Sequence, residues 1–280
     1  MESNLVSVLF LVAGYGTRLE RDLVNDGTKN NLLGLPKALL PLNEIPLLSH
    51  WMKLLQNPSI QSHLITNDKF YETFKNWSKM FEINENQLLN DKSTSNDDRL
   101  GAVADLELAV EKFNFISLQR DCLIIAGDTL FLKDFSLDQF LKIKNDVKGV
   151  LVTCVNVTDE DTKKMGIIEI DHKDTVKSNG KVCYRVTKLM EKPGPELTKS
   201  RLAVPCFYYL PWNCLKYLNI FMDEKKLLKE ELKEFDASGK FFTWLVDKFP
   251  VYTLEISGRL DIGGLKSYCE ADAYMKNASA

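Results

Sequence analysis

Short apolar runs alternate with amphipathic segments through the first half of the chain. Leu5–Ala13 and Asp121–Phe131 are nearly continuous apolar runs rich in Val, Leu and Ile. Such runs are typical of strands that are buried on both faces of a parallel sheet. Apolar side chains at helical spacing predict helices over Leu47–Leu55, Phe70–Phe81 and Gly101–Phe113. This alternation predicts an α/β fold with a central, mostly parallel sheet flanked by helices.

The second half has a different pattern. Gly166–Ile170, Val182–Met190 and Leu202–Leu210 are predicted strands, and a polar turn around Asn179 joins the first two. This spacing predicts a small antiparallel insertion whose strand pairs lie against the main sheet. Because no low-complexity linker or internal repeat interrupts the sequence, a single domain over residues 1–280 is the simplest organisation.

A glycine turn follows the first apolar run. It contains Gly14 and Gly16 and continues into Thr17 and Arg18. Glycine lets backbone N–H groups approach a ligand closely, and a guanidinium matches the geometry of phosphate. The turn matches neither a P-loop nor the dinucleotide-binding fingerprint. From these residues alone, a phosphate-binding turn and a structural turn are equally supported.

Three other short segments carry charged groups at defined turns. After a polar stretch from Glu20 to Gly34, predicted to be irregular, Lys37 lies between two prolines on a stiff, extended segment. Asp128 follows the second buried strand, at the edge of an open sheet where ligands bind. Glu191 and Lys192 leave a predicted strand at a rigid Pro-Gly-Pro turn.

Composition and charge exclude several classes of function. The net charge of −3 gives no general basic field for nucleic acid or an acidic membrane surface, so an anionic ligand needs local cations or a metal. The six cysteines form no CxxC motif or Cys/His cluster, which favours reduced thiols over disulfides or a zinc site. No apolar run has the length of a membrane span, and the first run lacks signal-peptide features. A cytoplasmic location is therefore expected.

Five motifs, taken in order, resemble those of the sugar-1-phosphate nucleotidyltransferases, also called NDP-sugar pyrophosphorylases. They are Gly14-Tyr15-Gly16-Thr17-Arg18-Leu19, Pro36-Lys37-Ala38-Leu39-Leu40-Pro41-Leu42, Gly127-Asp128, Glu191-Lys192-Pro193 and Asp261-Ile262-Gly263. The resemblance covers nearly the whole chain. It implies a Rossmann-like fold and a Mg²⁺-dependent reaction in which an NTP and a sugar 1-phosphate give an NDP-sugar and pyrophosphate.

The resemblance also implies roles for individual residues. Asp128 and Asp261 match the aspartates that hold Mg²⁺, and catalysis is assigned to Arg18, Lys37 and Lys192. The residues matching the nucleotide-binding positions are Ala13, Gly14, Gly16, Thr17, Arg18, Gly101 and Asp128. The residues matching the sugar-phosphate-binding positions are Gly166, Glu191 and Lys192. The NTP is accordingly expected mainly on residues 1–130, and the sugar phosphate mainly on residues 131–280.

These residue types suit the chemistry. A sugar phosphate loses its second proton near pH ~6, so the nucleophile is already ionised at neutral pH and needs no general base. The protein's work is to align two polyanions and to screen their repulsion. Mg²⁺ is usually held by one or two carboxylates together with substrate phosphates.

Some departures leave alternatives open. The stretch from Arg18 to Lys37 is longer than is usual in the family, and the first turn has one glycine fewer than many relatives. One alternative is a cytidylyltransferase that acts on a non-sugar phosphate such as phosphocholine. Another is a catalytically silent relative that binds a nucleotide-sugar and regulates. The nucleotide base, the acceptor, any allosteric control and whether the chain acts as a homo-oligomer are not readable from the sequence.

Overall fold

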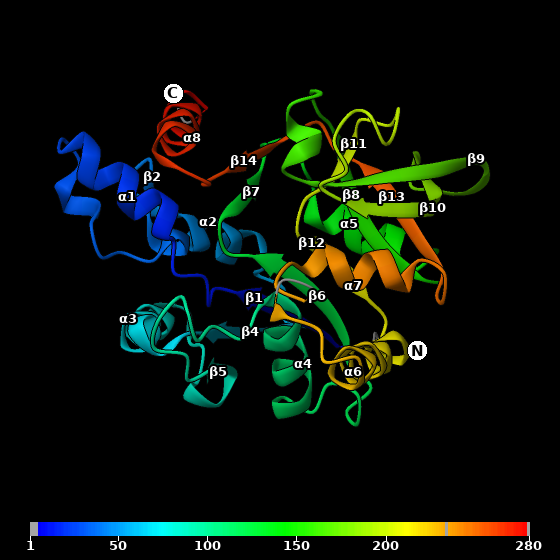
Figure 1. The fold of residues 1–280 in the computed structure, drawn as a ribbon, viewed down its shortest axis with the longest axis horizontal. Helices are drawn as coiled ribbons and strands as arrows, with labels where there is room; N and C mark the ends of the chain where they lie inside the picture. The colour runs from blue at the N-terminus through cyan, green and yellow to red at the C-terminus, as the bar shows by residue number, and fades with distance from the viewer. Residues whose placement is uncertain (1–4, 233–234, 279–280) are drawn as a thin grey trace.

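A ten-stranded mixed sheet forms the centre of the molecule, with helices on both faces (Figure 1). The structure is a computed structural model that describes residues 5–232 and 235–278. The strand order is β11-β9-β10-β13-β8-β12-β6-β1-β4-β5, and the run β6-β1-β4-β5 is parallel. Strands β1 and β6 therefore end at the same edge of the sheet, which is where ligands bind in open α/β folds.

Strands β1, β6 and β8 are almost entirely buried, whereas the longer β9 and β10 are largely exposed or half-buried. In the main sheet the strands are β1 Val6–Leu11, β4 Ile60–Thr66, β5 Leu88–Asn90, β6 Asp121–Ala126, β8 Val150–Asn156, β9 Gly166–Ser178, β10 Lys181–Glu191, β11 Leu202–Val204, β12 Phe207–Leu210 and β13 Val251–Glu255. Two small antiparallel pairs lie outside it: β2 Pro41–Leu42 with β3 Ile45–Pro46, and β7 Thr129–Phe131 with β14 Arg259–Asp261.

Alternate side chains of β1 enter two different cores. Val8 and Phe10 pack in one core, and Leu9 packs in the other, because successive residues of a strand point to opposite faces. The first core is covered by α1 Thr17–Asp26, α2 Leu47–Leu54, α3 Tyr71–Ser78, α5 Leu137–Lys144 and α8 Leu265–Asn277. The second is covered by α4 Ala102–Lys112, α6 Trp212–Leu227 and α7 Ser238–Leu245.

The predicted fold class is confirmed, with local corrections. The stretch Glu20–Gly34 is not irregular throughout, because α1 continues to Asp26 and buries Leu19 and Leu23 on one helical face. Asp121–Phe131 is two strands, since the chain leaves the main sheet at Gly127 and β7 pairs with β14 instead.

Two further local predictions also change. The strands β9, β10, β11 and β12 do not lie against the main sheet but are part of it. Strand β10 pairs with β13, which pairs with β8, and β12 lies between β8 and β6. The segment that carries Lys37 is a 3₁₀ turn over Lys37–Leu39, with extended residues on each side, rather than a continuous extended strap.

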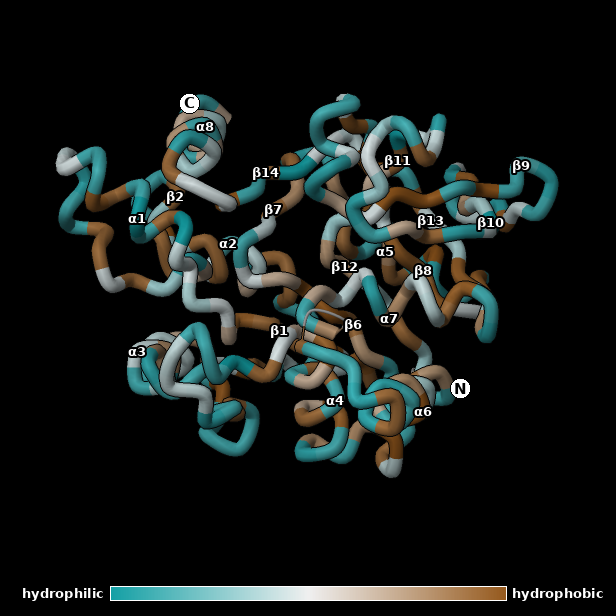
Figure 2. Tube along the Cα trace, viewed as in Figure 1, coloured by the Kyte–Doolittle hydropathy of each residue, from teal (hydrophilic) through white to brown (hydrophobic). Residues whose placement is uncertain are grey.

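Hydropathy follows this layering, with the apolar residues concentrated on the strands and on the inward sides of the helices (Figure 2). Within the described ranges, no helix is both long and apolar enough to cross a membrane. All six cysteines are free, and four of them, Cys122, Cys154, Cys183 and Cys214, are buried as small apolar side chains.

Candidate active site

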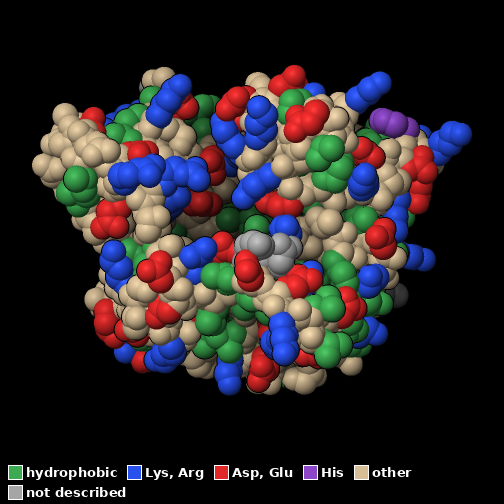
Figure 3. All heavy atoms as spheres, in the orientation of Figure 1, with side chains coloured by type: hydrophobic (Ala, Val, Ile, Leu, Met, Phe, Trp, Pro, Cys, Tyr) green, Lys and Arg blue, Asp and Glu red, His purple; other side chains and the backbone are tan. Residues whose placement is uncertain are grey.

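A cleft of about 900 Å³ opens at the edge of the sheet where β1 and β6 end. The space-filling view is hollowed at its centre, and Lys and Arg side chains stand around the hollow (Figure 3). Ten of the residues predicted to act at the site line this cleft: Ala13, Gly14, Arg18, Lys37, Gly101, Asp128, Gly166, Glu191, Lys192 and Asp261. Residues distant in sequence thus share one cavity.

The glycine turn forms part of the cleft wall. Asn67 Nδ2 donates a hydrogen bond to the carbonyl oxygen of Ala13 at 2.8 Å, which fixes the start of the turn. Gly14 has open space around the position of a Cβ, with no other atom within 4 Å. Gly16 precedes α1 with φ of 68°, in the left-handed region that favours glycine. The turn therefore exposes backbone at Gly14 and bends sharply at Gly16.

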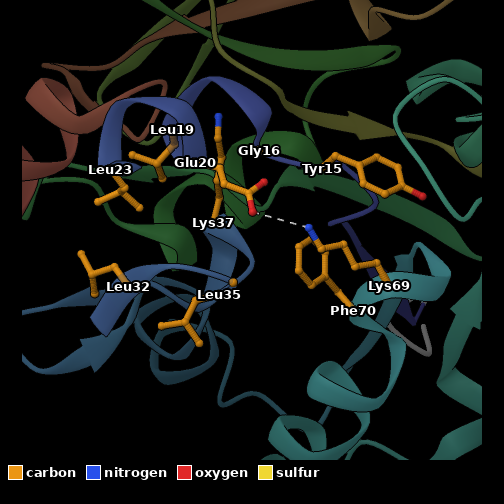
Figure 4. A pocket seen from close by; sticks show the side chains of 11 residues that line it. Tyr15, Gly16, Leu19, Glu20, Leu23, Leu32, Leu35, Lys37, Lys69 and Phe70 are labelled. Atoms are coloured by element: carbon orange, nitrogen blue, oxygen red, sulfur yellow. Dashed lines mark ion pairs between the residues drawn. The ribbon is translucent and has the colours of Figure 1, made fainter. Parts of the chain in front are cut away.

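A second, much smaller cavity lies behind the turn (Figure 4). Its volume is about 10 Å³, enough for about one water molecule. Gly16 and the stem of Lys37 border it, and the ion pair between Lys69 Nζ and Glu20 Oε1, at 3.8 Å, spans it. A Cβ on Gly16 would stand 3.3 Å from Lys37 Cγ, so the glycine leaves room for the lysine stem.

Lys37 and Asp128 meet on the floor of the cleft. Lys37 Nζ lies 3.8 Å from Asp128 Oδ2. The chain reaches this point through Gly127, where a Cβ would overlap Val12 Cγ1 and stand 3.0 Å from the Cβ of Ala38. Gly127 is therefore required for close packing against β1, and this packing sets the position of Asp128.

The short pair β7–β14 brings the second aspartate to the first. Asp261 is in register with Thr129, and the N–H of Ile262 donates to the carbonyl oxygen of Asp128 at 2.9 Å. The buried indole N–H of Trp51 donates a hydrogen bond to the carbonyl oxygen of Thr129 at 2.7 Å, which fixes the position of β7. Asp128 and Asp261 are thus held on neighbouring backbone segments despite their separation in sequence.

The two carboxylates interact electrostatically. Burial and the negative charge of Asp261 raise the pKa of Asp128, while Lys37 and Arg259 oppose that rise. Arg259 Nη1 lies 2.9 Å from Asp261 Oδ1. Arg18 Nη1 lies 3.8 Å from the position of a Cβ on Gly263, which follows Asp261 closely in the chain. Lys37 and Arg259 therefore each pair with one of the two carboxylates, and Arg18 lies near the segment that follows Asp261.

The carboxylate pair fits a hard divalent cation. Within the described part of the chain, no group of three or more His, Cys, Asp and Glu side chains could hold a metal. Two carboxylates are nonetheless the protein share of a site that is completed by substrate phosphates, as is common for Mg²⁺. A bound cation would also offset the negative charge of Asp261, which together with burial raises the pKa of Asp128.

The opposite end of the cleft is formed by β9, β10 and α7. Glu191 is paired with Gly166 in the β9–β10 ladder, and its side chain is 13% exposed. Lys192 Nζ lies 3.7 Å from Glu191 Oε1. A Cβ on Gly239 would overlap Glu191 Oε2, so Gly239 makes room for this carboxylate. Burial raises the pKa of Glu191, and Lys192 and Lys240 oppose the rise.

The third part of the cleft lies at the start of α4. Gly101 has φ of 92°, and a Cβ there would stand 3.0 Å from the Cα of Asp236. Arg99 makes a forked contact with Asp236, with Nε to Oδ1 at 3.1 Å and Nη2 to Oδ2 at 2.9 Å. Glycine is thus required where the turn before α4 packs against the turn before α7.

The comparisons with known proteins agree with this geometry. The sequence profile of a family described as "Nucleotidyl transferase" matches residues 7–278. The chain belongs to the nucleotidyl transferase family. This confirms the family indicated by the five motifs. A comparison with curated proteins gives no match.

Solved structures of other nucleotidyl transferases share the fold at low sequence identity. An apo UDP-glucose pyrophosphorylase is 17% identical, with a TM-score of 0.74 over 99% of this chain and 100% of that one. A putative glucose-1-phosphate thymidylyltransferase from Bacillus anthracis is 19% identical, with a TM-score of 0.70 over 97% of this chain and 96% of that one. An inositol-1-phosphate CTP transferase from T. maritima is 14% identical, with a TM-score of 0.66 over the full length of both chains.

In this nucleotidyl transferase, two predicted site residues lie elsewhere. Among the described residues, Gly16 borders the small cavity rather than the cleft, and Thr17 borders neither. Sequence reasoning also missed Arg259 and Gly239. Arg259 is two positions before Asp261, so alternation along a strand could have placed both on one face. Nothing in the sequence marks Gly239, because its neighbour Glu191 is brought to it by the fold.

Proposed function

We propose that this protein transfers a nucleoside monophosphate from an NTP to a sugar 1-phosphate and releases pyrophosphate, with Mg²⁺ as cofactor. The observation that carries the proposal is the grouping of Asp128, Asp261, Lys37 and Arg18 around one open cleft. Its volume of about 900 Å³ lies at the upper end of small-molecule sites, which suits two substrates bound together.

In this proposal the NTP lies along the glycine turn. The N–H groups beside Gly14 donate to its phosphates, and Arg18 neutralises charge that develops on the departing pyrophosphate. Lys37 contacts the α-phosphate, since its Nζ already lies beside Asp128 at the end of β6. Magnesium, when bound by Asp128 and Asp261, supplies charge neutralisation and alignment of the phosphate oxygens.

The sugar 1-phosphate binds at the other end of the cleft. Lys192 holds its phosphate, while Glu191 and the backbone at Gly166 bind sugar hydroxyl groups. What supports this assignment is the enclosure of the Glu191 carboxylate beside Gly166 and Gly239. A carboxylate is a strong acceptor for hydroxyl donors, and Lys192 keeps the local charge balanced.

The reaction requires no proton transfer to start. The acceptor phosphate is dianionic at neutral pH, so it attacks the α-phosphorus directly, and the bond to the pyrophosphate oxygen breaks. The protein contributes position and positive charge, which dominate the catalysis of phosphoryl transfer. The six free cysteines suit a reducing compartment, and we place the reaction in the cytoplasm.

The test is release of pyrophosphate by the purified full-length protein. ATP, CTP, GTP and UTP are each mixed with Mg²⁺ and a set of hexose 1-phosphates, with inositol 1-phosphate and phosphocholine as additional acceptors. We expect release with at least one NTP and hexose phosphate, and its loss in Asp261→Asn. Release only with phosphocholine or inositol phosphate would reject the sugar substrate, and no release with any pair would reject the transferase.

A further inference from the structure

Arg259 lines the cleft, although the proposed reaction gives it no role. It lies on β14, two positions before Asp261, and its side chain is 19% exposed. Nη1 is 2.9 Å from Asp261 Oδ1, and Nη2 is 3.1 Å from Met165 Sδ. Both of these partners also line the cleft. The guanidinium group is therefore held in the cleft wall, between the carboxylate pair and the segment that precedes β9.

The guanidinium group of Arg259 keeps hydrogen-bond donors for a further ligand. It carries five N–H groups in a planar fork, and a thioether sulfur such as that of Met165 is a weak acceptor. The carboxylate of Asp261 is the strong partner. In the proposed function Asp261 binds Mg²⁺, and a divalent cation offsets the charge of that carboxylate. The charge and the remaining N–H groups of Arg259 are then available to an anion in the cleft.

Met165 connects Arg259 to the end of the cleft that is assigned to the acceptor. Its carbonyl oxygen accepts a hydrogen bond from the N–H of Lys192 at 3.1 Å, and Gly166 follows it in the chain. Lys192 has φ of 51°, in the left-handed region that is unfavourable for a residue with a side chain. The hydrogen bond to Met165 helps to hold this strained conformation. Met165 therefore contacts Arg259 through its side chain and Lys192 through its backbone.

The charges at this end leave a dianionic phosphate short of cations. A sugar 1-phosphate is dianionic at neutral pH, whereas Lys192 Nζ lies 3.7 Å from Glu191 Oε1, so these two charges offset each other. Lys164 also lines the cleft, but its side chain is 60% exposed and pairs with Glu160 at 3.4 Å. Exposed lysines contribute little to an ion pair. Arg259 is more enclosed, and its fork matches the geometry of a phosphate group.

We propose that Arg259 binds the phosphate group of the acceptor substrate, together with Lys192. The proposal rests on the proposed function, because it assumes a phosphorylated acceptor in the cleft. The N–H groups that Asp261 does not engage donate to oxygens of this phosphate, while Nη1 stays paired with Asp261. Arg259 thereby connects the acceptor phosphate to the carboxylate that is assigned to Mg²⁺. This connection holds the nucleophile beside the α-phosphate that it attacks.

The test measures acceptor binding without turnover. Isothermal titration calorimetry of the full-length protein with hexose 1-phosphates is run in the presence of Mg²⁺ and an α,β-methylene NTP, with the analogues of ATP, CTP, GTP and UTP used in turn. In Arg259→Met the hexose 1-phosphate should bind about 10- to 100-fold more weakly than in the wild type, the usual effect of losing a hydrogen bond to a charged group. The affinity for the analogue should stay nearly the same, because Arg18 and Lys37, which are assigned to it, remain.

Two further variants separate a phosphate contact from other roles of Arg259. Arg259→Lys keeps the charge but loses the fork, so it should recover part of the lost affinity. Lys164→Met removes an exposed cation from the same cleft and should change the affinity for the hexose 1-phosphate by less than about threefold. If Arg259 only positions Asp261, its replacement should weaken binding of the analogue with Mg²⁺ and leave the affinity for the hexose 1-phosphate unchanged.

The possible results distinguish this contact from the transferase assignment. An unchanged affinity for the hexose 1-phosphate in Arg259→Met, or equal losses for the hexose 1-phosphate and the analogue, overturns the phosphate contact while the transferase assignment stands. Failure of the wild type to bind any hexose 1-phosphate with any analogue overturns both the contact and the sugar acceptor. Circular dichroism spectra establish that each variant is folded. If Arg259→Met does not fold, the comparison is made with Arg259→Lys, in which a loss of affinity relative to the wild type is also expected.

Discussion

A substitution at Gly14 distinguishes a phosphate-binding turn from a purely structural turn. A Cβ at this position would meet no other atom within 4 Å, and the residue is not among the glycines with positive φ. Gly14→Ala should therefore leave the fold intact. An alanine in a compatible conformation stabilises the folded state by about 0.4–1 kcal/mol, because it restricts the unfolded chain.

The same substitution should weaken nucleotide binding. Gly14 lines the cleft and has open space at the position of a Cβ, so we expect a methyl group there to keep phosphate oxygens away from the backbone N–H groups. A hydrogen bond to a charged group contributes about 1.5–3 kcal/mol, so the loss of one such contact predicts about 10- to 100-fold weaker binding. Calorimetry with the nucleotide and Mg²⁺ measures the affinity, and urea denaturation measures the stability.

Gly127→Ala is the matched control. Its Cβ would overlap Val12 Cγ1 and stand 3.2 Å from the carbonyl oxygen of Leu11, so this variant should lose about 1–3 kcal/mol of stability. Relative to the wild type, Gly14→Ala should therefore be more stable and Gly127→Ala less stable. If Gly14→Ala binds the triphosphate as tightly as the wild type, the turn is structural and its assigned role is wrong.

Three further substitutions test other parts of the cleft. Gly239→Ala should displace the Glu191 carboxylate and raise KM for the sugar phosphate about tenfold or more, while the nucleotide affinity stays unchanged. An unchanged KM would reject the role of Glu191. Asp261→Asn should lower Mg²⁺-dependent turnover by at least about 100-fold. The control Glu270→Gln, which removes an exposed charge on α8, should leave turnover unchanged. Equal effects of the two substitutions would reject the metal assignment. Because burial and Asp91 raise the pKa of Asp105 to about 8, wild-type stability should fall as pH rises from about 4 towards 8. Asp105→Asn should thus gain stability relative to the wild type between pH 5 and pH 8 in urea denaturation, by on the order of 1 kcal/mol or more, and a constant difference would contradict the raised pKa.

The parts of the fold that the sequence predicted are those determined locally. The apolar run of β1 is buried on both faces, as its composition indicated, and Gly101 precedes α4 as predicted. The stretch after Glu20 was predicted to be irregular because polar residues and turn formers dominate it. Two leucines one helical turn apart, Leu19 and Leu23, are nevertheless sufficient for a buried helical face.

The parts of the site that sequence reasoning missed depend on contacts between distant segments. The ion pair of Arg259 with Asp261 lies on a strand whose partner, β7, was expected to continue β6. Asp91, which follows β5, and Asp105, on α4, each affect the pKa of the other, and neither residue has a sequence signal beyond its acidic side chain. Periodicity reports the environment of one segment, whereas these contacts need the tertiary arrangement.

The position of the metal tests the proposed active site most directly. Crystals of the protein grown with a non-hydrolysable NTP analogue and Mn²⁺ in place of Mg²⁺ would give an anomalous difference map. The proposed site predicts a manganese peak between the two aspartates, in direct contact with a carboxylate oxygen of Asp128, a carboxylate oxygen of Asp261 and the triphosphate. A triphosphate bound in the cleft with no metal peak at these two carboxylates would contradict it.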